Sequence, residues 1–148
     1  MSRIVFCCGT NLTRSPMAAA YFNSLLTEAG VTDIEVCSAG IAAPHGATIT
    51  WEARETLHRK NLEPLAFGTT QLLPKLIKSA SLIVCMTEEQ QEKIQSMFVS
   101  AKGKVRPLMS IVHSSRPVRE PPKGDLQATI ACLELMIPAL RELVKIIA

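Results

Sequence analysis

The sequence predicts an α/β domain of three layers, with a four-stranded parallel sheet between helices. Short β-forming segments alternate with helical ones along the chain. Residues 82–86 are apolar without interruption, which is typical of a strand buried on both faces, as in parallel sheets. With 148 residues the chain has the length of one ordinary domain, so we expect residues 1–148 to form a single domain.

The first half of the sheet is predicted from two strands and the helix between them. Residues 3–7 are rich in β-forming side chains and give the first strand. Ser15 and Pro16 then supply a cap and a first-turn proline for a helix, which runs into a stretch of alanines. Residues 34–37 give the second strand.

The second half begins with a third strand over residues 81–86. A capping box at residues 87–90 opens the next helix, and residues 104–109 give a weaker fourth strand. From residue 126 to residue 147, apolar side chains recur at alternating spacings of four and three. This pattern predicts a long final helix, which Pro138 should kink.

Composition indicates a soluble, cytoplasmic protein. Hydrophobic residues make up 47% of the chain and charged residues 20%, and a net charge of +3 is too small to indicate a nucleic-acid partner. No apolar run approaches the roughly 18 residues that cross a bilayer, so we expect no membrane partner. The five cysteines are odd in number and contain no Cys-x-x-Cys pair, which favours a reducing compartment without structural zinc.

The loop between the first strand and the first helix has the residues of an anion site. It reads Cys8-Gly9-Thr10-Asn11-Leu12-Thr13-Arg14-Ser15 and is called the phosphate loop below. Because it lies at the C-terminal edge of a parallel strand and opens a helix, its N–H groups and the helix dipole favour one bound anion. The planar guanidinium of Arg14 matches the oxygens of a phosphoryl group. We expect residues 9–13, namely Gly9, Thr10, Asn11, Leu12 and Thr13, to contact the substrate.

The same positive field favours the thiolate form of Cys8, which makes it a nucleophile. Ser15 is placed to donate its hydroxyl to that thiolate and to improve it as a leaving group. Cys7 lies on the opposite side of the strand, where we expect it in the core. In the competing interpretation Cys8 is a small buried side chain, Arg14 a surface charge and Ser15 an ordinary helix cap.

These residues resemble the N-terminal signature of the low-molecular-weight protein tyrosine phosphatase family, and the resemblance covers essentially all 148 residues. It implies a four-stranded parallel sheet and hydrolysis of phosphomonoesters without metal or cofactor. The partner would be a phosphorylated protein or a small phosphomonoester. It also implies Cys8 as nucleophile, Arg14 as phosphate clamp, and hydrogen bonds from Asn11 and Ser38 that hold the loop in shape.

The family's general acid is an aspartate before proline on a late loop, and the matching residue here is Glu120. Its carboxyl group can protonate a leaving oxygen and then activate water. Asp125 is the second choice, because its position before the last helix first predicts an N-cap. If the loop requires a positive φ at Thr10, that residue would be strained. Phe67 takes the place of a histidine that often braces the loop.

Two residues bear on specificity. Trp51, near the start of a helix, is a candidate wall that stacks on an aromatic substrate. Leu12 presents an apolar surface inside the phosphate loop, whereas the family's arginine-phosphate phosphatases tend to carry threonine there. Leu12 therefore favours phosphotyrosine.

Two other functions stay open. A degenerate phosphatase that only binds phosphoproteins is suggested by Glu120, Thr10 and Phe67. Arsenate reduction on the same scaffold would need a relay of thiols, for which Cys85 and Cys132 lie in unsuitable segments. No metal is expected, because the three histidines occur at no metal-ligand spacing: His45, His58 and His113.

Overall fold

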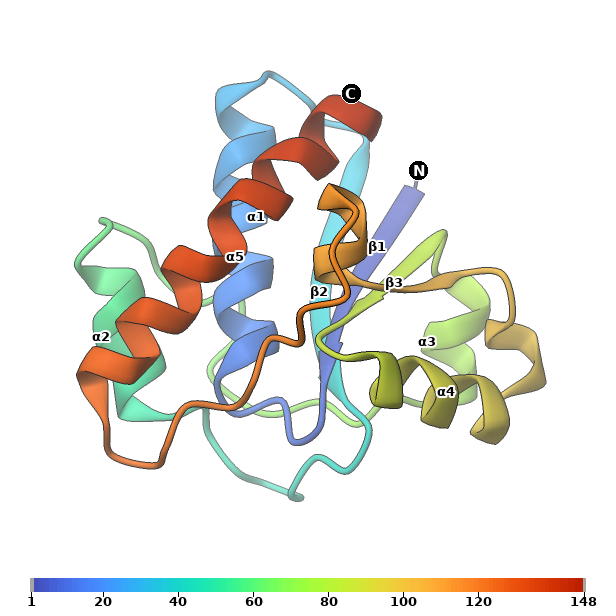
Figure 1. Ribbon diagram of the computed structural model, residues 1–148, viewed down its shortest axis with the longest axis horizontal. Helices are drawn as coiled ribbons and strands as arrows, with labels where there is room; N and C mark the ends of the chain where they lie inside the picture. The colour runs from blue at the N-terminus through green and yellow to red at the C-terminus, as the bar shows by residue number, and fades with distance from the viewer. Residues whose placement is uncertain (1, 148) are drawn as a thin grey trace.

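The computed structural model describes residues 2–147, which form a parallel sheet with helices on both faces (Figure 1). The strands are β1 (Ser2–Cys8), β2 (Ile34–Gly40), β3 (Leu82–Cys85) and β4 (Val105–Pro107). Their order in the described sheet is β2-β1-β3-β4, and every pair is parallel. The predicted fold class is confirmed.

The helices divide between the two faces of the sheet. α1 (Arg14–Glu28), α2 (Trp51–His58) and α5 (Leu126–Ile147) pack together on one side, while α3 (Pro74–Ser79) and α4 (Glu88–Met97) lie on the other. Two short 3-10 helices, η1 (Val99–Ala101) and η2 (Leu108–Val112), complete the described elements. None of the helices between residues 2 and 147 has the length and apolar character required to span a bilayer.

Alternation along β1 divides the core into two parts. Phe6 and Cys8 belong to the cluster under α1 and α5, and Val5 and Cys7 belong to the cluster under α3 and α4. β1 is thus buried on both faces, as expected for a central parallel strand. Burial raises the pKa of the Cys7 thiol well above its ordinary value, so this side chain stays a neutral core residue.

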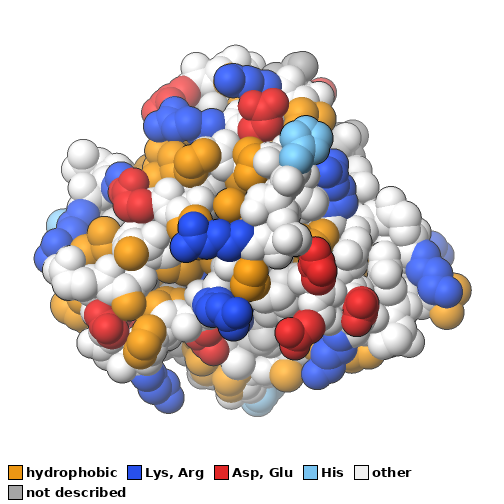
Figure 2. Space-filling view, in the orientation of Figure 1, with side chains coloured by type: hydrophobic (Ala, Val, Ile, Leu, Met, Phe, Trp, Pro, Cys, Tyr) orange, Lys and Arg blue, Asp and Glu red, His pale blue; other side chains and the backbone are white. Residues whose placement is uncertain are grey.

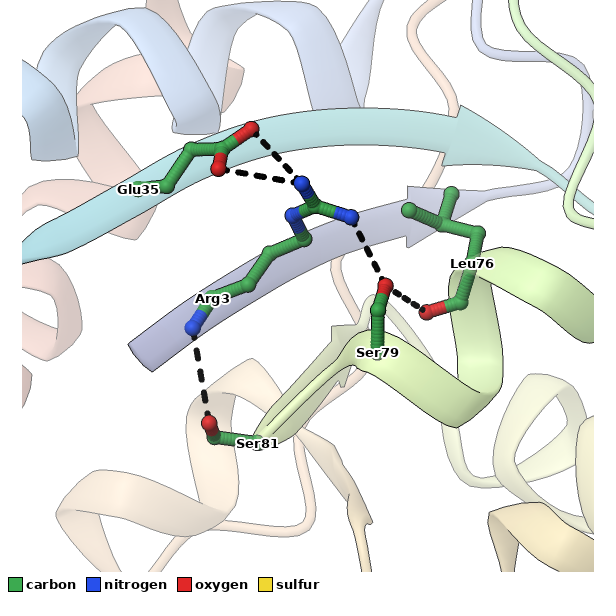
Figure 3. A network of polar contacts seen from close by, with 5 residues as sticks. All are labelled: Arg3, Glu35, Leu76, Ser79 and Ser81. Atoms are coloured by element: carbon green, nitrogen blue, oxygen red, sulfur yellow. Dashed lines mark hydrogen bonds and ion pairs between the residues drawn. The ribbon is translucent and has the colours of Figure 1, made fainter. Parts of the chain in front are cut away.

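An arginine network ties the N-terminal ends of the strands together (Figure 3). Arg3 on β1 donates through Nη2 to both carboxylate oxygens of Glu35 on β2, at 3.0 and 3.1 Å. Its Nη1 donates to Ser79 Oγ at 2.7 Å, and Ser79 donates in turn to the Leu76 carbonyl. The network joins α3 and both strands at the edge of the sheet opposite the phosphate loop.

Several boundaries differ from the sequence predictions. α1 begins at Arg14 instead of after a Ser15 cap, and β2 continues to Gly40. α3 was not predicted. α5, in contrast, has the predicted bounds and runs through Pro138, which is exposed, to Ile147.

Candidate active site

The phosphate loop joins the end of β1 to the start of α1 at the C-terminal edge of the sheet. Cys8 is the last residue of β1 and Arg14 the first of α1, and both are buried. The first N–H groups of a helix have no intrahelical partner and carry partial positive charge. The junction is therefore a natural position for an anion.

Ser15 lies next to the Cys8 thiol. Its Oγ is 3.0 Å from Cys8 Sγ and 3.3 Å from the Ala39 carbonyl oxygen. A hydroxyl has one hydrogen to donate, and a thiolate is a stronger acceptor than a neutral carbonyl. The Ser15 hydroxyl is thus positioned to donate a hydrogen bond to the Cys8 sulfur. The N-cap residue of α1 is Thr13, whose side chain makes no capping hydrogen bond.

Asn11 connects the middle of the loop to its surroundings. Its backbone is left-handed, with φ of 60°, a conformation that asparagine tolerates. Its Oδ1 accepts from the Thr70 N–H at 2.8 Å, and its Nδ2 donates to Ser15 Oγ at 2.8 Å and to Ser38 Oγ at 3.0 Å. Thr10 is not among the described residues with positive φ, so the strain considered for it does not arise.

Gly40 allows the loop to approach β2 closely. A Cβ atom at Gly40 would lie 2.8 Å from both the Asn11 nitrogen and the Thr10 carbonyl carbon, which are backbone atoms. The backbone continues this contact, since Ile41 N–H donates to the Cys8 carbonyl and Ala42 N–H to the Gly9 carbonyl. The role of Gly40 was not predicted from the sequence, where the available signal was a glycine shortly after the second predicted strand.

Arg14 links the loop to the segment before α5. Its Nη1 donates to the Val118 carbonyl at 2.8 Å, while its buried Nε has no partner among the described residues. Its Nη2 lies 3.9 Å from the point that a Cβ of Gly9 would occupy. Because a buried guanidinium donor without a partner costs free energy, the unpaired Nε is available to an oxyanion held by the loop.

Thr50 lies outside the phosphate loop, contacts it, and was missed by sequence reasoning. Thr13 Oγ1 and Thr50 Oγ1 are 3.0 Å apart, and Thr50 N–H donates to the Leu12 carbonyl at 2.8 Å. Thr50 also caps α2, accepting from Ala53 N–H. Thr10 Oγ1 is also buried without a hydrogen-bond partner among residues 2–147. The loop therefore has two such polar atoms, Thr10 Oγ1 and Arg14 Nε.

Two hollows open at the loop. The main hollow, of about 630 Å³, and the side hollow, of about 410 Å³, both include Thr10 and Glu120. Cys8 is 1% exposed and is not part of either lining. The main hollow is lined by Gly9, Thr10, Arg14, Ile41, Ala42, Thr87, Glu89, Gln90, Lys93, Pro117, Arg119 and Glu120. The side hollow is lined by Thr10, Leu12, Thr13, Thr50, Glu52, Glu120, Pro121, Pro122, Lys123 and Thr129.

The two candidate acids differ in position. Glu120 lines both hollows together with residues of the phosphate loop. Asp125 lines neither; its Oδ1 accepts from Ala128 N–H at 2.9 Å at the start of α5. The structure therefore places Glu120 at the loop and Asp125 in the capping position that the sequence first predicts for it.

Trp51 is not brought to the phosphate loop. It is 59% exposed and lines a separate hollow that also includes Phe67. This placement does not support the hypothesis that Trp51 forms a wall of the substrate site. The loop is braced without Phe67, because the Thr70 backbone holds Asn11 and the Gln71 side chain donates to the Ile41 carbonyl at 2.6 Å.

The other cysteines are buried or half-buried. Burial raises the pKa of Cys85 to about 12 and that of Cys132 to about 11, so both thiols stay protonated near neutral pH. All three histidines are exposed. Within residues 2–147, no group of three or more histidine, cysteine or acidic side chains is arranged to hold a metal ion.

Comparisons with known proteins agree with this geometry. Residues 3–148 match the model of the family described as low molecular weight phosphotyrosine protein phosphatase. A protein-arginine-phosphatase of Bacillus subtilis is 32% identical, over 96% of this chain and 94% of its own. The low molecular weight protein-tyrosine-phosphatase Ptp of Acinetobacter johnsonii is 31% identical, over 68% and 67%.

Among solved structures, the low molecular weight protein tyrosine phosphatase from T. tengcongensis superposes with a TM-score of 0.92 at 25% identity, covering 99% of this chain and 100% of its own. The chain therefore belongs to the low-molecular-weight phosphotyrosine protein phosphatase family, and it is a phosphatase.

Replacing Gly40 with alanine tests the close approach between β2 and the phosphate loop. Since the new Cβ would meet backbone atoms that cannot rotate away, we expect Gly40→Ala to lower the free energy of unfolding by about 1 to 3 kcal/mol. The control is Gly68→Ala, whose Cβ would find its nearest neighbour at 3.8 Å. Urea denaturation measures both, and equal stability of the two variants would contradict the close approach.

Proposed function

We propose that the protein hydrolyses phosphotyrosine in proteins or small aryl phosphates through a phosphocysteine at Cys8. The observation that carries the proposal is the convergence on one loop of the Cys8 thiol, the Ser15 hydroxyl 3.0 Å from it, and a buried Arg14 whose Nε has no partner among the described residues. Phosphoryl transfer without a metal requires a nucleophile and hydrogen-bond donors that bind the oxygens of the phosphoryl group.

In the first step the Cys8 thiolate attacks phosphorus, and the S–P bond forms as the bond to the leaving oxygen breaks. Backbone N–H groups of residues 9–13 and the Arg14 guanidinium bind the equatorial oxygens, where negative charge is spread. Glu120 gives its proton to the leaving oxygen. This assignment is supported by its position on both hollows.

In the second step water attacks phosphorus, and Glu120, now a carboxylate, takes the proton of that water. The new O–P bond forms as the S–P bond breaks, and the thiolate of Cys8 is released. The Ser15 hydroxyl stabilises that thiolate, which makes it a better leaving group. Phosphate then departs and the starting state is restored.

Leu12 supports phosphotyrosine as the substrate. It lines the side hollow as a half-buried apolar side chain, which suits contact with an aromatic ring. The second candidate is phosphoarginine, because a relative that is 32% identical over nearly the whole chain is named for that activity. The residues that line the main and side hollows also favour phosphoarginine. They include the carboxylates Glu52, Glu89 and Glu120, which can accept hydrogen bonds from a guanidinium, and they include no aromatic ring.

The other two functions receive less support. Thr10 lacks the suspected strain, and the loop is braced through Thr70, so two of the reasons for a degenerate binding module are removed. An arsenate reductase needs thiols that ionise and exchange in turn. Burial of Cys85 and Cys132, with raised pKa values, works against such a relay.

The choice of acid is tested by the leaving-group dependence of turnover. We expect Glu120→Gln to slow phenyl phosphate, whose leaving group needs a proton, by about 10² to 10⁴-fold, and p-nitrophenyl phosphate far less. Asp125→Asn keeps the helix cap and should leave both rates near wild type. The reverse pattern, with Asp125→Asn selectively impairing the poor leaving group, would assign the acid to Asp125.

The substrate is tested by comparing kcat/KM on peptides of one sequence that carry phosphotyrosine or phosphoarginine. We expect wild type to prefer phosphotyrosine, and Leu12→Thr to lower the phosphotyrosine-to-phosphoarginine ratio by about tenfold, since apolar contact is lost. Leu73→Thr, an exposed leucine outside both hollows, is the control. A wild-type preference for phosphoarginine would instead favour the second candidate.

A further inference from the structure

Another hollow adjoins the main hollow and is called the basic hollow below. It has a volume of about 460 Å³ and is lined by Arg116, Pro117, Arg119, Pro121, Ala128, Ala131, Cys132 and Leu135. Pro117 and Arg119 also line the main hollow. The two hollows are therefore adjacent and share lining residues. A substrate peptide bound in the main hollow can extend into the basic hollow.

The charged side chains that line the basic hollow are all positive. Its only charged lining residues are Arg116 and Arg119, both exposed, and neither makes an ion pair with any residue from 2 to 147. The main hollow, in contrast, includes carboxylates beside its basic groups. Figure 2 shows Lys and Arg side chains near the centre of one face of the molecule, with hydrophobic side chains beside them.

The rest of the basic hollow is apolar. Ala128, Ala131 and Leu135 come from successive turns of α5, and Pro117 and Pro121 come from the segment between η2 and α5. Small side chains and prolines leave room for the methylene groups of an incoming side chain while guanidinium groups bind its end. A carboxylate on a short aliphatic stem complements such a surface in both charge and shape.

We propose that the basic hollow binds an acidic side chain of the substrate protein, close in sequence to the phosphorylated residue. The inference rests on the proposed function, because it places the phosphorylated side chain in the main hollow. An extended chain advances about 3.3 to 3.6 Å per residue, so a residue a few positions away reaches an adjacent hollow. The protein would then select phosphorylation sites by the charge beside them.

The test uses peptides of one sequence that contain phosphotyrosine and carry either glutamate or lysine at one to four positions on each side. We expect wild type to prefer glutamate at one of these positions by about two- to fivefold in kcat/KM, the size of an exposed ion pair, and expect salt to weaken the preference. In Arg116→Glu the preference should disappear or reverse. Arg116 lines only the basic hollow, so hydrolysis of p-nitrophenyl phosphate should stay at the wild-type rate.

The control is Lys102→Glu, which makes the same change of net charge at an exposed residue outside all three hollows. It should keep the glutamate preference. If wild type hydrolyses p-nitrophenyl phosphate but shows no preference, or if Arg116→Glu retains it, the basic hollow is not a recognition site. If wild type hydrolyses neither p-nitrophenyl phosphate nor any peptide, the proposed function fails and this inference fails with it.

Discussion

The bracing of Asn11 is the constraint on which the rest of the site depends. Its left-handed backbone turns the loop, and its side chain makes hydrogen bonds to Thr70, Ser15 and Ser38, which lie on three different segments. An amide side chain has both donors and an acceptor, so one residue can satisfy all three partners. Gly40 allows the loop to pack closely against β2, since any side chain there would collide with the loop backbone.

A loop held in this way fixes the relation between Cys8 and Arg14. Both are buried, and each has a further hydrogen-bond partner: the Ser15 hydroxyl, within the loop, for Cys8 and the Val118 carbonyl, outside it, for Arg14. Positioning of this kind is what phosphoryl transfer requires, because the enzyme's contribution is mainly orientation and charge stabilisation. The bond to Val118 also couples the loop to the segment that carries Glu120, two residues further on.

Much of this arrangement was predictable from the sequence because it depends on local patterns. The apolar run of β3, the proline and alanines of α1, and the position of the loop between β1 and α1 are visible in neighbouring residues. Contacts between distant segments were not. Thr50 and Thr70 meet the loop only after folding, whereas the contact between Ser15 and the Cys8 thiol lies within the loop and was predicted.

The same limit explains Trp51 but not Asp125. Proximity of Trp51 to the start of α2 suggested a wall of the site, but the helix directs that side chain to a separate hollow with Phe67. Asp125 carries the right chemical group at nearly the right place in the chain, yet its carboxylate is engaged at the N-terminus of α5. The direction of the Trp51 side chain is set by tertiary packing, whereas the Asp125 cap is a local contact that its position before α5 predicted.

Transfer of the phosphoryl group to Cys8, held by this braced loop, is the step on which the proposed function depends. It is tested most directly by mixing the enzyme with excess p-nitrophenyl phosphate, quenching within one turnover and locating the phosphate by mass spectrometry. We expect phosphate on the sulfur of Cys8 and on no other residue. Turnover with Cys8 unmodified at every quench time, or with phosphate on a different side chain, would contradict it.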